Sequence, residues 1–432
     1  MPVAQNTSSS MIVRTANNAV YTIYNLGLNQ ILAGQDIISG IGDNWNFAVV
    51  PGAVNWDFAF NNGQGALDLW VSRPSGGNNQ FFIYNISGNT NVTPPPPPNN
   101  PTGIAGAIGQ DWKVQGFGYF FRSDFGQADM VTRQDAGGIA TYKIYDTTSN
   151  QLNISVPGPI VGNNWNTAGT GTYLTNGFGI TNNPNNFAGL LFLQTNTAVG
   201  PTIAAGTILP YVYRNGTLVN AAGSLPDSTG KINNPFAVTG QTVLGFGHFT
   251  SQPVMGNTPD SLATFPLGMI TRDTTTSNGS FWIYDIQQNV DQTGAPYYTA
   301  VNGKVLIASG DVGSNMQFAG FAPVSGGLGP ITDDMVLRNT NNGALQVYDI
   351  QDDTLTGSAP LTPPASKPIA PTSTVGGMAI DLSGAPPSGS TSQLVQAMAS
   401  FGGGSGAADS LNTAPLSADT SQQTFLTTPQ HA

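Results

Sequence analysis

The hydrophobic pattern of the chain is dominated by a short apolar strand that recurs six times and ends in the same way each time. It closes on Ile or Val, then Tyr, then a polar or charged residue. The copies are Ile23-Tyr24-Asn25, Ile83-Tyr84-Asn85, Ile144-Tyr145-Asp146, Val212-Tyr213-Arg214, Ile283-Tyr284-Asp285 and Val347-Tyr348-Asp349. Their tyrosines are separated by 60, 61, 68, 71 and 64 residues, which indicates an internal repeat.

Further apolar strands accompany each copy. One lies about 9 to 20 residues earlier and is joined to it by turn residues such as Asn341-Asn342-Gly343, which predict a hairpin. These strands are Met11–Arg14, Asp68–Arg73, Asp129–Arg133, Gly189–Gln194, Gly268–Arg272 and Asp334–Arg338. A third strand precedes this pair and contains Gly-Phe-Gly or a variant of it, as in Gly116-Phe117-Gly118. A fourth, weaker strand follows each Tyr motif.

Four short strands in each of six repeats predict an all-β fold, a β-propeller of six four-stranded blades. The repeats start near residues 11, 67, 129, 189, 268 and 334. A solenoid is the alternative, which the Gly-Phe-Gly strand disfavours because missing side chains suit a crowded strand near an axis. The first repeat begins on its second strand, so its inner strand must come from elsewhere. Pro2–Gln5 and Val375–Ile380 are the two candidates, and we prefer the later segment.

Domain boundaries follow from composition. We expect an N-terminal arm at 1–10, the propeller at 11–361, a Pro/Ser/Thr/Gly linker at 362–391 and a flexible tail at 392–432. Residues 392–401 could form a short helix within this tail. A plain disordered tail and a C-terminal secretion signal of the type I kind are the two interpretations of this end.

The order Gly-Phe-Gly-x-Phe, Asp-Met-Val-x-Arg, Val-Tyr-Asp resembles the FG-GAP/VCBS repeats of bacterial extracellular proteins, relatives of the integrin α-subunit propeller. The resemblance covers residues 11 to about 361. It implies a propeller fold, but it does not select one function, because such repeats serve adhesion, carbohydrate binding, catalysis and scaffolding alike.

The family's calcium loop is degenerate in this chain. The best match, Phe60 to Asp68, keeps Asn62, two glycines and Asp68, whereas Phe60 and Gln64 replace two acidic ligands. Because calcium affinity follows the number of charged oxygen ligands, we expect no bound calcium and no other cofactor or metal.

Composition narrows the class of protein further. The chain has 12 Lys and Arg against 23 acids, all of them Asp, and its formal net charge is −11. It has two histidines, His248 and His431, and no cysteine, which excludes Cys-bearing zinc sites, Cys nucleophiles and disulfides. Sparse, scattered cations argue against nucleic-acid binding, and no 18-residue apolar run predicts a membrane span. The start of the sequence does not resemble a classical signal peptide.

Five of the seven arginines occupy one repeat position, namely Arg14, Arg73, Arg133, Arg272 and Arg338. They could form a cationic ring for an anionic ligand, but we favour a structural role in which the guanidinium satisfies carbonyl groups. The fourth repeat has Gln194 at this position. The repeated tyrosines could stack on sugars, but packing between blades is the simpler interpretation. Trp56 and Trp282 are better surface candidates.

The acid pairs Asp333-Asp334 and Asp352-Asp353 would suit general acid–base catalysis, but they flank turns and have no supporting constellation. His248 is interpreted as structural. No catalytic residue is therefore assigned, and the chain is not expected to be an enzyme.

The function predicted is a non-catalytic extracellular binding or adhesion module that recognises a glycan or a protein through loops on one propeller face. Its ligand-binding residues and oligomeric state stay open. The best candidates for the ligand surface are the polyproline segment Pro94–Pro101 and the insertions 196–208 and 251–266. A structural surface or matrix protein is the alternative, and an Asp-based hydrolase is a weaker one.

Overall fold

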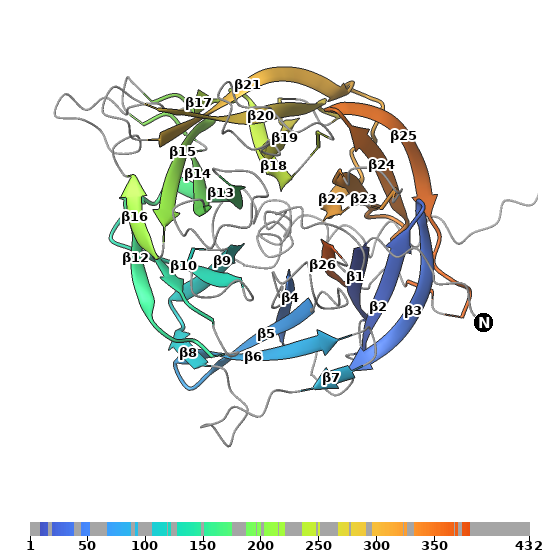
Figure 1. Cartoon of the computed structure of the whole chain (residues 1–432), viewed down its shortest axis with the longest axis horizontal. Coiled ribbons are helices and arrows are strands. Elements are labelled where there is room, and N and C mark those ends of the chain that lie inside the picture. Colours follow the sequence, from blue (N-terminus) through green and yellow to red (C-terminus); the bar gives the residue numbers. More distant parts are fainter. Residues whose placement is uncertain are drawn as a thin grey trace, which may run out of the picture.

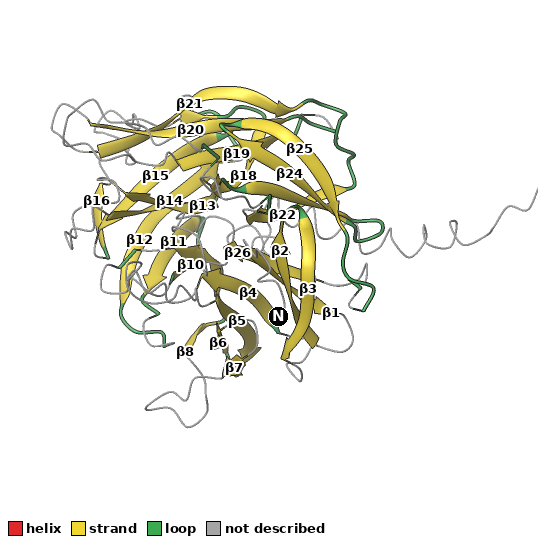
Figure 2. Cartoon of the chain, turned by 45° about the vertical axis from the view of Figure 1, so that its right-hand side comes forward, coloured by secondary structure: helices red, strands yellow, loops and turns green. Residues whose placement is uncertain are grey.

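The computed structural model describes much of the chain up to residue 380. The described ranges are 9–15, 20–38, 45–51, 67–87, 91–93, 106–118, 120–121, 128–147, 151–174, 187–195, 197–199, 203–214, 216–220, 236–247, 249–250, 267–275, 278–290, 296–322, 324–325, 332–366, 368–369 and 374–380. Every helix or strand assigned within these ranges is a strand (Figure 2). None of the elements described is a helix with the length and hydropathy that a membrane crossing requires.

Six small antiparallel sheets stand in a ring, and the chain is a six-bladed β-propeller (Figure 1). In the first three blades the strands run from the centre outward in a fixed order. The first blade is β26 (Thr374–Ile380), β1 (Ser9–Thr15), β2 (Val20–Gly27) and β3 (Gln30–Ile38). The second is β4 (Asn46–Pro51), β5 (Leu67–Ser75), β6 (Asn78–Ser87), then β7 (Asn91–Thr93) and β8 (Gly106–Gly109). The third is β9 (Trp112–Gly118), β10 (Asp129–Ala136), β11 (Ile139–Tyr145) and β12 (Ser155–Gly162).

The last three blades repeat this order. The fourth blade is β13 (Trp165–Leu174), β14 (Phe187–Thr195), β15 (Thr207–Arg214), then β16 (Thr217–Asn220) and β17 (Phe236–Ala237). The fifth is β18 (Gln241–Gly247), β19 (Leu267–Asp273), β20 (Phe281–Val290) and β21 (Pro296–Ile307). The sixth is β22 (Met316–Ala322), β23 (Asp334–Asn339), β24 (Leu345–Gln351) and β25 (Thr354–Leu361). The predicted hairpins and repeat starts are confirmed.

The core consists of six apolar clusters, one at each interface between neighbouring blades. Second strands such as β10 and β23 are buried on both faces because each lies between two blades. Outer strands alternate instead, as in β25, where exposed and partly buried residues follow one another. The repeat therefore places apolar residues wherever two blades meet.

The repeated tyrosines follow one packing rule. Each belongs to the apolar cluster between its own blade and the preceding blade. Tyr213 is fully buried, and Tyr84 and Tyr284 are partly buried against their clusters. The packing interpretation of this motif is confirmed.

The glycines of the inner strands make room for a neighbour, as expected, although the neighbour is an aromatic ring rather than backbone. A Cβ on Gly169 would lie 2.6 Å from Cδ2 of Phe246, which belongs to the next blade. A Cβ on Gly118 would lie 2.8 Å from the ring of Phe120. Phe246 stacks at 4.1 Å on Phe192 of the fourth blade, so the missing side chain lets two blades interlock near the axis.

The ring closes through the later of the two predicted segments. β26 pairs antiparallel with β1, and in this register Met378 lies opposite Met11 and Ala379 opposite Ser10. The first blade thus joins residues near 10 to residues near 380 in one sheet. The expected propeller range 11–361 is corrected to include this strand, which lies inside the range assigned to the linker. The tail and its possible helix at 392–401 lie outside the described residues.

The outer strands of the second and fourth blades are each split in two. β7 and β8 both pair with β6, at opposite ends of it, and the chain between them is 94–105. In the same way β16 and β17 both pair with β15, and the chain between them is 221–235. Residues 94–105 and 221–235 therefore each interrupt the outer strand of a blade.

Candidate functional site

Strand direction assigns each connection to one end of the propeller. Connections from an inner strand to a second strand, and from a third to a fourth, leave at the same end, which we call the loop face. The inner-to-second connections are 52–66, 119–128, 175–186, 248–266 and 323–333. Second-to-third hairpins leave at the opposite end, which we call the turn face, and two of them are the tight turns Gly76-Gly77 and Gly137-Gly138.

The three segments proposed as one ligand surface are attached to their blades at different strand ends. Residues 251–266 belong to a loop-face connection, whereas 196–206 join β14 to β15 at the turn face. The polyproline segment falls between β7 and β8 at the outer edge of the second blade. Residues 94–105 and 251–266 lie outside the described residues, so a single ligand surface built by these insertions stays a prediction.

A repeated contact ties neighbouring blades together at the loop face. The hairpin between the third and fourth strands of one blade donates a backbone N–H to the preceding blade. The acceptor is the carbonyl two residues after the inner strand, and we call each such contact a blade joint. The joints are Gly216 N to Phe120 O at 2.7 Å, Asp353 N to Phe249 O at 3.2 Å and Asn29 N to Val324 O at 3.0 Å.

Aspartate carboxylates hold the start of two of the loop-face connections. Asp334 Oδ2 accepts the N–H groups of Val324 and Ser325 at 2.8 and 2.6 Å. Asp129 Oδ2 accepts those of Phe120 and Phe121 at 2.6 and 2.8 Å. Asp129 and Asp334 stand at the end of the segments that correspond to the degenerate calcium loops. Their carboxylates accept hydrogen bonds from the backbone N–H groups at the start of the same connections.

Burial raises the pKa of Asp334 to about 7, against the hydrogen bonds from Ser325 and Ile350 that lower it. The neighbouring Asp333 is also fully buried. Asp334 is thus occupied by backbone N–H groups, including Ile350 N at 3.1 Å from Oδ1, and it serves the structure of the sixth blade. The second acid pair, Asp352-Asp353, forms a hairpin turn with φ of 49° and 56°.

Three of the five repeated arginines reach forward to the next blade, where they donate to the carbonyl of the first residue of its inner strand or of the residue just before it. Arg133 donates to Trp165 O at 2.7 Å, Arg272 donates to Met316 O at 3.1 Å, and Arg14 donates to Trp45 O. Arg133 also donates to Asn163 O and Asn166 Oδ1, both at 2.9 Å. Arginine at this repeat position therefore fastens blades, as the structural interpretation predicts.

Gln194 performs the same task with an amide. Its Nε2 donates to Gln241 O at 3.0 Å, and its Oε1 accepts from Val243 N at 3.3 Å. The second blade differs again, because there Asn79 Nδ2 donates to Trp112 O at 2.9 Å, and Arg73 lies 4.5 Å from the ring of Trp45.

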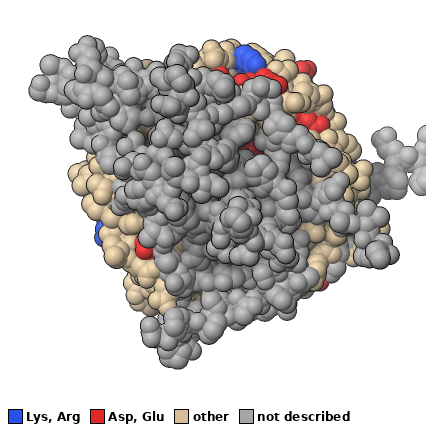
Figure 3. Space-filling view, in the orientation of Figure 1, with Lys and Arg blue, Asp and Glu red and all other residues tan. Residues whose placement is uncertain are grey.

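Other candidate residues are placed as follows. Trp282 is partly buried on β20, where it stacks on Tyr284 with ring centroids 6.4 Å apart. Trp56, Asn62, His248 and His431, together with the side chain of Asp68, lie outside the described residues. In the part of the chain that the structure describes, no three His, Cys, Asp or Glu side chains converge as a metal site requires. On the face drawn in Figure 3, the described Lys and Arg atoms form small separate patches at the rim.

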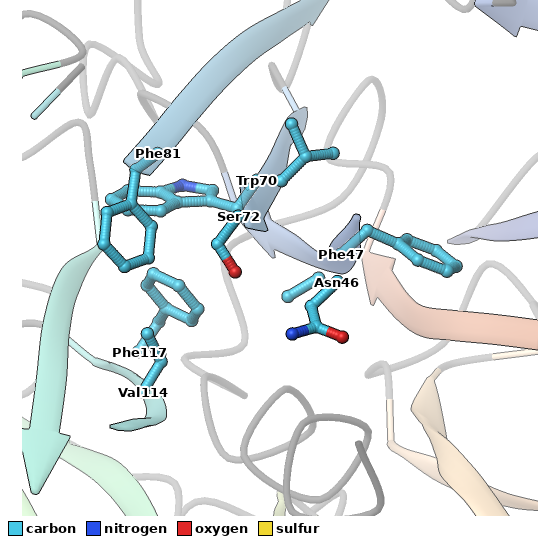
Figure 4. Close-up of a pocket in the computed structure, with 9 residues that line it drawn as sticks. Asn46, Phe47, Trp70, Ser72, Phe81, Val114 and Phe117 are labelled. Atoms are coloured by element: carbon cyan, nitrogen blue, oxygen red, sulfur yellow. The ribbon is translucent and has the colours of Figure 1, made fainter. Parts of the chain in front are cut away.

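A small cleft, with room for about one water molecule, lies between the second and third blades (Figure 4). Trp70, Phe81 and Phe117 line one side, and Asn46 and Phe47 the other. β4 pairs with β5 without the register shift that β9 makes against β10. The second blade therefore presents a different inner strand to its neighbour than the third blade does.

Neither the protein-family models nor the curated proteins that were searched include a match to the chain. The six-bladed ring is consistent with the repeat family that the sequence resembles.

Proposed function

We propose that this chain is a non-catalytic binding module that recognises a glycan or a protein partner with its loop face. The observation that supports it most is the strand order, by which the five inner-to-second connections leave their strands at the same end of the propeller. The blade joints and the buried Asp129 and Asp334 hold the start of three of these connections against the ring. Binding loops on a rigid scaffold are a common arrangement in recognition proteins.

The sequence of the connections favours contact with sugars or with flat protein surfaces. The connection 52–66 alone contains Trp56, Phe58 and Phe60, with Asn61 and Asn62 beside them. Aromatic rings stack on sugar faces, and amides supply hydrogen bonds. We further propose an extracellular location and membership of the FG-GAP/VCBS repeats, supported by the repeat motifs and the absence of cysteine.

The test uses the full chain in a glycan-array assay and in affinity capture of proteins. We expect saturable binding that Trp56→Ala weakens by at least tenfold, because this residue belongs to a loop-face connection. Trp282→Ala is the matched control, since Trp282 lies near the turn-face end of β20, and it should leave binding unchanged. Binding that survives Trp56→Ala and loop-face deletions, or no binding in either assay, would contradict the proposal.

One observation favours the alternative of a structural protein that associates with itself. Ile139, Ile154 and Ile160 are 48%, 71% and 65% exposed along the outer edge of the third blade. Exposed apolar side chains in one region are typical of contact surfaces. Sedimentation velocity across a concentration series distinguishes the two functions: self-association abolished by Ile160→Lys supports a structural role, and a monomer at all concentrations contradicts it.

A further inference from the structure

The blade joint between the fifth and sixth blades carries an unusual pair of acids. The turn Asp352-Asp353 between β24 and β25 reaches over the fifth blade, where Asp353 N donates to Phe249 O at 3.2 Å. This contact places the Asp353 side chain against the start of the connection after β18. Thr250 Oγ1 donates to Asp353 Oδ1 at 3.2 Å.

The carboxyl group of Asp285 on β20 lies next to that of Asp353, in the position where Asp349 contacts Asn29 at the next joint, and it is near enough for a hydrogen bond if one of the two acids carries a proton. Asn302 Nδ2 donates to Asp285 Oδ2 at 2.8 Å, so one oxygen of Asp285 is already engaged. A hydrogen bond between two carboxyl groups needs a proton on one of them, because two carboxylates only accept.

The other ionisable groups around the pair are Lys304 on β21 and Asp352 in the turn itself. Lys304 Nζ lies 3.5 Å from Asp352 O and 3.5 Å from Thr354 Oγ1, and its charge opposes the effect of Asp285 on Asp353. Lysine and acidic atoms lie side by side over β21 at the upper rim in Figure 3. A single exposed ammonium therefore accompanies the acids at this joint.

The next joint around the ring provides an internal comparison. There Asn29 N donates to Val324 O, and Asn29 Nδ2 donates to Asp349 Oδ2 at 2.7 Å. Asp349 and Asp285 occupy the same position of the Tyr-Asp motif, and Asn29 corresponds to Asp353. The joint between the sixth and first blades is thus an amide–carboxylate hydrogen bond that needs no proton.

We propose that the joint between the fifth and sixth blades is a proton-dependent latch, in which Asp285 and Asp353 share one proton while the hairpin is docked. When the proton leaves, the hydrogen bond between the two acids is replaced by repulsion between two carboxylates, and the turn keeps only its backbone contact and its contacts with Thr250 and Lys304. The latch is tight in mildly acidic solution and loose at neutral pH.

The sign of this effect follows from proton linkage. Burial and the nearby charge of Asp285 raise the pKa of Asp353 from its ordinary 3.8 to about 6. The docked hairpin therefore binds more protons than the undocked hairpin between these pH values. Docking weakens as the pH rises from about 4 through about 6 and does not change further above that range.

The test measures hydrogen exchange at the amide of residue 353 in the full chain, as protection factors corrected for the intrinsic rate. We expect the wild-type factor to fall about tenfold between pH 5 and pH 7.5, because pH 5 lies about one unit below the pKa of Asp353 in the docked hairpin and pH 7.5 lies above it. In Asp353→Asn, which copies the neighbouring joint, the factor should be the same at both pH values.

The opposite substitution, at the neighbouring joint, is the matched control. Asn29→Asp should introduce the same pH dependence at the amide of residue 29, where the wild type has none. A wild-type factor at residue 353 that does not change with pH would overturn the latch. Persistence of the change in Asp353→Asn would also overturn it, because the pair would then not be its cause.

Discussion

Arg133 provides the sharpest test of how the blades are fastened. Its side chain is 7% exposed, and its guanidinium donates to Trp165 O, Asn163 O and Asn166 Oδ1. Arg133→Ala leaves the two carbonyls without these donors at the interface of the third and fourth blades. Each buried polar group left unsatisfied costs about 1–3 kcal/mol, so we expect a loss of about 3–5 kcal/mol in the free energy of unfolding.

Two further substitutions separate the hydrogen bonds from the charge. Arg133→Lys keeps the charge but cannot reach all three acceptors, so we expect about half of the loss. Asp135→Asn removes the ion pair at 2.7 Å, whose acid is 45% exposed, and should cost less than about 1 kcal/mol. Urea unfolding measures the free energy of unfolding of all three variants, provided that its dependence on urea concentration is the same as in the wild type. A loss below about 1 kcal/mol for Arg133→Ala, or equal losses for Arg133→Ala and Asp135→Asn, would refute the reasoning.

Three other predictions follow from the described contacts. Gly169→Ala should destabilise the chain by about 1–3 kcal/mol in urea unfolding, because its Cβ would meet the ring of Phe246; a neutral result would show that this ring can move aside. Because the pKa of Asp334 is about 7 in the folded chain, stability should fall as the pH rises from about 4 to 7, and Asp334→Asn should flatten that part of the pH profile of the melting temperature. Tyr211→Phe removes a buried hydroxyl that has no hydrogen-bond partner among the residues that the structure describes, so calorimetry should show an unchanged or higher melting temperature.

The sequence predicted the fold well because the repeat shows both the strands within each blade and the succession of blades along the chain. Within a blade, the Tyr motif and the strand before it identify the third and the second strand. Between blades, the missing inner strand of the first repeat required a partner elsewhere, and Val375–Ile380 was correctly preferred. These features are local patterns of apolar residues, which a single sequence displays directly.

The contacts that position the loop face were harder to predict. The role of Gln194 was missed because a glutamine does not resemble an arginine in the sequence. Both side chains nevertheless donate to the carbonyl of the first residue of the next blade's inner strand. The three insertions were assigned to one surface without following their strand boundaries from end to end. Counting strand directions attaches residues 196–206 and 251–266 at opposite ends of their strands.

The pairing of Asp285 with Asp353 lies beyond sequence reasoning. These residues are 68 positions apart and in different repeats. Only the reach of the hairpin between β24 and β25 onto the fifth blade brings them together. The repeat did contain one usable signal, since Asp349 and Asp285 occupy the same motif position while the residues facing them differ.

The closed ring is the basis of the loop face, and its seam can be tested directly because the chain contains no cysteine. In the double variant Ser10→Cys/Ala379→Cys, the two thiols lie on directly opposed residues of β1 and β26, a placement that suits a disulfide. The control variant Ser10→Cys/Ile380→Cys shifts one cysteine to the other side of the sheet. We predict a disulfide in the first variant, seen as lost thiol titration, and free thiols in the control. Free thiols in both variants would contradict closure of the ring by β26.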